Sequence, residues 1–156
     1  MWDIRQIWWK GKTLMLSTKP PEFKAQPSCE DRIDESLAND LDELLQIVET
    51  GATEEGTEAW EYGLSFDYSG SFWRLVLMTG GPHAEFRFSF RRSFDGPMDV
   101  EYMYADWGDS ARRWLDGWTG DRKANERNLN AARALWDTYF VEQARHLLTE
   151  EAKYLQ

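Results

Sequence analysis

The sequence predicts an α+β two-layer sandwich, in which helices cover one face of a four-stranded antiparallel meander sheet. Two patterns predict this class. Apolar residues recur at helical spacing in residues 28–50 and 121–154, and they alternate with polar residues across residues 60–106. The chain of 156 residues is the size of one domain, and its aromatic content of 15% supplies large side chains for a core. We therefore expect a single domain over residues 1–156, with residues 1–27 as an N-terminal segment.

Residues 28–50 have the clearest helical pattern. Ser28, with Asp31 three residues later, resembles a capping box at the start of a helix, and Gly51 is expected as the left-handed residue after its end. The apolar residues between them fall on one stripe, made of Ile33, Leu37, Leu41, Leu44, Leu45 and Val48. The segment is therefore expected to be an amphipathic helix that packs on the sheet.

Residues 60–106 are expected to form four strands joined by tight turns at residues 69–70, 80–82 and 95–97. Such short links require antiparallel pairing. The outward-facing charges are Glu61 and Asp67 on the first strand, Arg74 on the second, Arg87 and Arg91 on the third, and Asp99 and Glu101 on the fourth. Opposite charges on neighbouring strands favour the meander order. The second strand is apolar on both sides, which indicates a central position.

After the sheet, residues 110–118 are expected to form a turn or short helix with Asp109 or Ser110 as its N-cap. Trp107, Trp114 and Trp118 recur at spacings of seven and four, which is typical of a buried helical stripe but also fits a stacking site for a base or a sugar. A long helix is expected over residues 121–154. Its buried face would consist of Leu129, Ala132, Trp136, Tyr139, Phe140, Gln143 and Leu147.

The whole net charge of −10 lies in residues 30–61. This stretch holds 12 acids and one base, Arg32, whereas the rest of the chain holds 16 acids and 17 bases. Its helical part spans about 30 Å, a length over which one DNA strand carries about nine phosphates. One acidic helix could therefore imitate one phosphate strand. The candidate partner-binding residues, all expected off the apolar stripe, are Asp34, Glu35, Asp40, Asp42 and Glu43.

No catalytic constellation is recognisable in the sequence. His83 and His146 have no partner at metal-ligand spacing, and phosphate-loop, dinucleotide and nucleophile-elbow patterns are missing. The single cysteine, Cys29, excludes an internal disulfide and a multi-cysteine zinc site. We therefore expect no catalytic residue, no metal and no cofactor. An alternative pocket for a small molecule or nucleotide would be formed by His83, Asp106, Trp107 and Asp109.

Two segments carry a family resemblance. Leu77-Met78-Thr79-Gly80-Gly81-Pro82, followed by Val100-Glu101-Tyr102-Met103-Tyr104-Ala105-Asp106-Trp107, resembles short uncharacterised proteins encoded by phages, prophages and plasmids. The resemblance covers residues 60–118. It implies an accessory protein of a mobile element, a class in which some members inhibit host defence, as anti-CRISPR proteins do. It assigns no catalytic residue.

These observations predict a non-enzymatic acidic binding protein that engages a basic, nucleic-acid-binding surface of a host protein, such as a CRISPR or restriction complex. Two alternatives stay open: a small-molecule or nucleotide-binding domain at the alternative pocket, and a structural domain whose acidic face is merely solvated. Clustered Lys and Arg for direct nucleic-acid binding are missing. No segment is typical of a signal peptide or approaches the roughly 20 apolar residues of a membrane span, so we expect a cytoplasmic protein without membrane contact.

Overall fold

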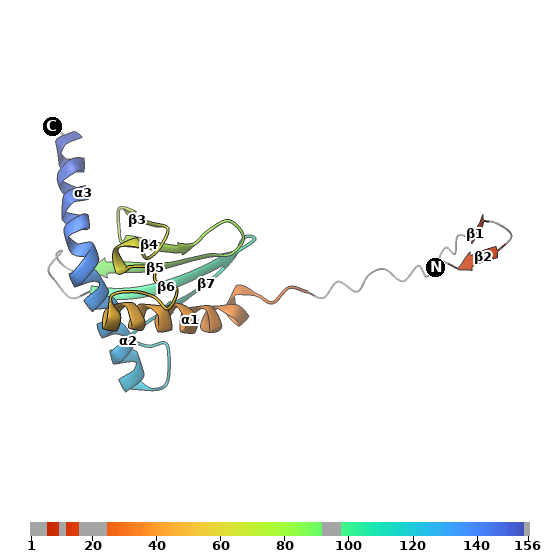
Figure 1. Ribbon diagram of the computed structural model, residues 1–156, viewed down its shortest axis with the longest axis horizontal. Helices are drawn as coiled ribbons and strands as arrows, with labels where there is room; N and C mark the ends of the chain where they lie inside the picture. Colours follow the sequence, from red (N-terminus) through yellow and green to blue (C-terminus); the bar gives the residue numbers. More distant parts are fainter. Residues whose placement is uncertain (1–5, 10–11, 16–24, 92–97, 155–156) are drawn as a thin grey trace.

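The computed structural model describes residues 6–9, 12–15, 25–91 and 98–154. Its main part is a five-stranded antiparallel sheet in the order β3-β4-β5-β6-β7, with helices on one face (Figure 1). A two-stranded antiparallel hairpin pairs β1 (Gln6–Trp9) with β2 (Lys12–Met15). The α+β class and the antiparallel meander are confirmed, and the sheet has one strand more than predicted.

Helix α1 (Cys29–Thr50) begins and ends where the local sequence indicates. The Ser28 side chain accepts a hydrogen bond from the Asp31 backbone N–H, and the Asp31 carboxylate accepts one from the Ser28 N–H, so the capping box is confirmed. Gly51 ends the helix with a φ of 86°. The buried stripe consists of Cys29, Ile33, Leu37, Leu41, Leu44 and Ile47, with Leu45 and Val48 partly buried beside it.

The five strands of the sheet are β3 (Ser65–Tyr68), β4 (Trp73–Met78), β5 (His83–Phe90), β6 (Met98–Asp106) and β7 (Asp109–Trp114). Strand β4 is an interior strand, as predicted, because it pairs with β3 on one side and with β5 on the other. The additional strand, β7, pairs with β6 at the far edge of the sheet. The predicted turn at residues 95–97 lies outside the described residues.

The first strand of the sheet is shorter than predicted. Ala59–Glu61 form a 3-10 turn, η1, and β3 begins only at Ser65. Between them, Gly63 has a φ of 88°, and a Cβ at this position would lie 2.6 Å from Leu75 Cδ1. The position therefore requires glycine. This bend interrupts the alternation of the predicted first strand, and Trp60 and Leu64 are exposed.

Residues 109–114 form strand β7 rather than the predicted turn or short helix. The β6–β7 link is Trp107-Gly108, with φ values of 47° and 83°, and positive φ at both positions is typical of a two-residue hairpin turn. Only Ala111 of the six strand residues is buried, so the apolar alternation that signals a strand is missing here. Trp107 and Trp114 are exposed, and the predicted buried tryptophan stripe is wrong.

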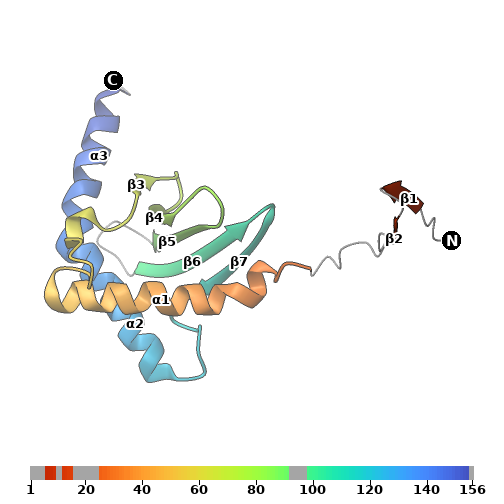
Figure 2. The same cartoon turned by 45° about the vertical axis from the view of Figure 1, so that its right-hand side comes forward.

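The C-terminal helix is confirmed over residues 122–154, as α2 (Arg122–Leu135), the π-helical turn η2 (Trp136–Phe140) and α3 (Val141–Tyr154). Figure 2 shows it crossing the C-terminal end of α1. In η2, Trp136 packs against aromatic rings of the sheet, and Phe140 is buried beside it. Gln143, expected on the buried face, is exposed. Helix α1 and the C-terminal helix pack on the same face of the sheet, and no helix of the described residues covers the opposite face, which we call the open face.

Candidate functional site

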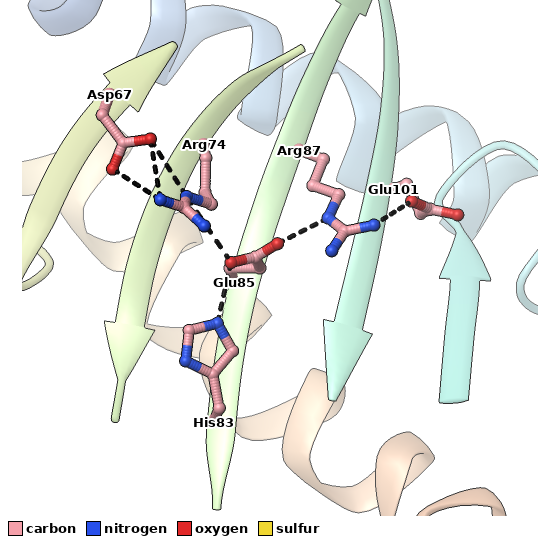
Figure 3. Close-up of polar contacts among 6 residues, drawn as sticks. All are labelled: Asp67, Arg74, His83, Glu85, Arg87 and Glu101. Atoms are coloured by element: carbon pink, nitrogen blue, oxygen red, sulfur yellow. Dashed lines mark hydrogen bonds and ion pairs between the residues drawn. The ribbon is translucent and has the colours of Figure 1, made fainter. Parts of the chain in front are cut away.

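The open face of the sheet carries a row of charged side chains that crosses four strands (Figure 3). At its centre, Glu85 is only 1% exposed. Its carboxylate accepts a hydrogen bond from Arg87 Nε at 2.5 Å and lies 2.7 Å from His83 Nε2 and 3.9 Å from Arg74 Nε. The complete row is Asp67, Arg74, His83, Glu85, Arg87 and Glu101. Two of the predicted pairings of opposite charge form, Asp67 with Arg74 and Glu101 with Arg87, whereas β4 and β5 both carry arginines.

The Glu85 carboxylate lies between two guanidinium groups, those of Arg74 and Arg87. Arg74 and Arg87 are directly opposed in the β4–β5 register, an arrangement that is destabilising unless an anion lies between them. Glu85 supplies this anion, and it also orients His83. A carboxylate-oriented histidine can serve in acid–base catalysis. Here, however, the carboxylate is shared with two guanidinium groups, so the arrangement is that of an ionic cross-link between strands.

The acidic charges of α1 are partly neutralised within the chain. Arg113 of β7 lies 2.8 Å from Asp34 and 2.7 Å from Glu30, and the Trp118 indole N–H donates to Asp34 at 2.8 Å. The hydrogen bond from Arg113 lowers the pKa of Asp34 below its usual value. Asp34, a predicted partner-binding residue, is therefore already ion-paired. No local pattern indicates this pair, because its members are 79 residues apart.

Exposed carboxylates nevertheless run along the whole of α1. Asp31, Glu35, Asp42 and Glu49 lie at spacings of four and seven and form one stripe, which we call the acidic stripe. Glu43 is exposed beside it. Over the 22 residues of the helix, this is roughly half the charge density of one DNA strand. The match to a phosphate strand is therefore weaker than the sequence predicted.

Asp40 does not lie on the outer face, and this part of the prediction is wrong. Its carboxylate accepts a hydrogen bond from the Tyr102 hydroxyl of β6, which also contacts Ser36 at 2.7 Å. Burial raises the pKa of Asp40 to about 6, despite the opposing effect of the Tyr102 hydrogen bond. Position 40 borders the apolar stripe closely enough for a short polar side chain to turn towards the sheet.

The raised pKa makes stability depend on pH. Because folded Asp40 holds its proton more tightly than the unfolded chain, its contribution to the free energy of unfolding is largest below about pH 4 and is lost as the pH rises through about 6. We expect Asp40→Asn to gain about 2–3 kcal/mol relative to wild type between pH 4 and pH 7, measured by urea denaturation. Asp42→Asn on the acidic stripe is the matched control. A parallel pH dependence of wild type and Asp40→Asn would contradict the assignment.

A recess of about 690 Å³ opens beside the C-terminal half of α1. Five carboxylates line it, those of Asp42, Glu43, Glu54, Glu55 and Glu61. None of its described lining residues is basic. Burial, together with the charge of Glu55, raises the pKa of Glu43. Leu64 forms part of the lining, and Trp60, 68% exposed, precedes Glu61 at the rim. This acidic recess combines negative charge with accessible apolar surface.

Of the four residues of the predicted alternative pocket, Asp106 and Asp109 are opposed across the β6–β7 hairpin with Trp107 in the turn between them, but His83 is not brought to them. His83 belongs to the row on the open face, whereas Asp106 pairs with Arg32 of α1 at 2.7 Å. Asp109 accepts a hydrogen bond from the Cys29 backbone N–H at 2.7 Å, so it caps α1 rather than a helix of its own. Trp107, 90% exposed, lies at the tip of the β6–β7 hairpin.

Comparison of the chain with protein-family models, curated proteins and solved structures finds no match. Within residues 25–91 and 98–154, no group of three His, Cys, Asp or Glu side chains is arranged to hold a metal ion. None of the helices in this part of the chain is long and apolar enough to cross a membrane. The assignment of function therefore rests on the geometry and charge of the surfaces described above.

Proposed function

We propose that this protein is a non-enzymatic docking protein that binds a basic, nucleic-acid-binding surface of a host protein, such as a CRISPR or restriction complex. The observation that carries the proposal is the continuity of the acidic stripe of α1 with the acidic recess at its C-terminal end. Together they present carboxylates along the length of the helix and beyond it. Such a field accelerates encounter with a basic partner and disfavours acidic ones.

Exposed tryptophans at the two ends of α1 support a protein partner. Trp60 follows the C-terminal end of the helix, and Trp107 lies on the hairpin whose Asp109 caps the N-terminal end. Large aromatic side chains within a charged surface are typical anchors of protein interfaces, where most of the binding energy comes from a few residues. The carboxylates would thus steer association, and the indoles would limit dissociation.

The test reverses charge on the acidic stripe. We expect Glu35→Lys, Asp42→Lys and Glu49→Lys in one variant to slow association with a fluorescent Lys/Arg-rich peptide by about tenfold or more at low salt. Stopped-flow fluorescence at two salt concentrations measures the rate. The wild-type rate should fall steeply as salt is added, because surface charges are screened. The three residues are exposed, so the fold should tolerate the change.

A matched control separates position from net charge. Glu126→Lys, Asp137→Lys and Glu151→Lys make the same six-unit change on the C-terminal helix, at three exposed positions. Equal slowing by both triple variants would overturn the assignment to α1. A second measurement follows labelled DNA bound to purified CRISPR and restriction complexes. Failure of the wild-type protein to displace this DNA would overturn the host assignment, even where the peptide binds.

A further inference from the structure

A groove separate from the acidic recess lies beside β7, the edge strand at the other side of the sheet from β3. It has a volume of about 590 Å³, which is within the range of small-molecule sites. Its charged and aromatic lining consists of two indoles, three arginines and two aspartates: Trp114, Trp118, Arg91, Arg112, Arg113, Asp99 and Asp116. Trp114 is 49% exposed, so its ring is accessible to a ligand.

Two side chains of the groove are held in place by the fold. The Trp118 indole N–H donates to Asp34 at 2.8 Å, and Arg91 forms two hydrogen bonds with Asp99, each of 2.7 Å. Side chains that are already oriented lose little conformational entropy when a ligand binds. The groove is therefore preorganised on both sides of Trp114.

The remaining polar groups of the groove are balanced in charge. The Arg112 and Asp116 side chains form no hydrogen bond or ion pair with the described residues. The Arg112 guanidinium therefore remains as a donor group for a ligand, and the Asp116 carboxylate remains as an acceptor group. Arg91 is paired with Asp99, and Arg113 with Glu30 and Asp34 of the acidic helix. A phosphate would approach a groove without excess positive charge on a chain of net charge −10, which is unfavourable.

We propose that this groove binds a neutral carbohydrate. The C–H faces of a pyranose ring pack on an indole, whose face is electron-rich. Neighbouring hydroxyl groups can accept from the Arg112 guanidinium and donate to the Asp116 carboxylate, which gives orientation without net charge. A stacked nucleotide would share the indole but would need positive charge for its phosphate. The observed balance favours the uncharged ligand, independently of the proposed docking function.

Titration calorimetry with neutral tetrasaccharides tests the proposal, using the α-1,4-glucose, β-1,4-glucose and β-1,4-N-acetylglucosamine series, with AMP as the anionic comparison. We expect at least one tetrasaccharide to bind, with an affinity that hardly changes between 50 and 500 mM salt. Trp114→Ala should weaken this binding about tenfold or more, and Asp116→Asn should weaken it while keeping the indole. Trp60→Ala, a substitution at an exposed tryptophan outside the groove, should leave it unchanged. Circular dichroism verifies that each variant is folded.

Three results would overturn the carbohydrate assignment: no binding of any tetrasaccharide at 10 mM, binding that survives Trp114→Ala, or salt-sensitive binding of AMP alone. The last would identify the groove as a nucleotide site. Because these variants leave the acidic stripe intact, failure here is distinguishable from failure of the docking function.

Discussion

Trp136→Ala is expected to destabilise the protein by about 3–5 kcal/mol, the range for truncation of a large buried aromatic side chain. Trp136 is 2% exposed, and its ring centroid lies between 5.1 and 5.9 Å from those of Phe66, Trp73, Phe88 and Phe90. It therefore joins three strands of the sheet to the C-terminal helix. Truncation removes these ring contacts and leaves a cavity between the two layers.

Urea denaturation of Trp136→Ala and Trp114→Ala measures the difference. Trp114 is half-exposed on the open face, so its truncation should change the free energy of unfolding by only about 0.5 kcal/mol. Comparable losses for the two variants would show that the core does not lie between η2 and the sheet.

Glu85→Gln is expected to cost about 3–5 kcal/mol, although it removes only a charge and keeps the shape of the side chain. The substitution leaves Arg74 and Arg87 opposed across β4 and β5 without the shared carboxylate. Arg87 is the more affected, because its side chain is only 13% exposed and its remaining partner, Glu101, lies at 3.4 Å. A buried charge that loses its partner is costly, because little water can reach the charge to solvate it in place of the partner.

Two further variants make the Glu85 prediction specific. Asp67→Asn removes a carboxylate at the exposed end of the row and should cost about 1 kcal/mol or less. Combining Glu85→Gln with Arg87→Met removes both charges, and the pair should be less destabilising than the sum of the single changes. Additive single effects, or a cost of Glu85→Gln below about 0.5 kcal/mol, would contradict the ionic cross-link.

Local sequence was sufficient for the elements whose signals lie within one segment. The capping box at Ser28, the apolar stripe through Leu41 and the terminal Gly51 specify α1 within 24 residues, and the structure has all of them. The same holds for the C-terminal helix and for the charges that pair across neighbouring strands. Strand β7 escaped prediction because it buries one residue and begins at a turn with tryptophan, not asparagine or aspartate, at positive φ.

The candidate binding surface also has a part that local sequence predicts and a part that depends on contacts between distant segments. Local patterns were enough to show that the chain concentrates its negative charge on one amphipathic helix and that its strands form an antiparallel meander. Which of those charges are paired within the chain depends on the packing of the helix against the sheet. Asp34 meets Arg113 across 79 residues and Asp40 meets Tyr102 across 62, whereas Glu35 and Asp42 stay in water. Helical periodicity sets the direction in which a side chain leaves its helix, but the group that it meets comes from a strand far away in the sequence.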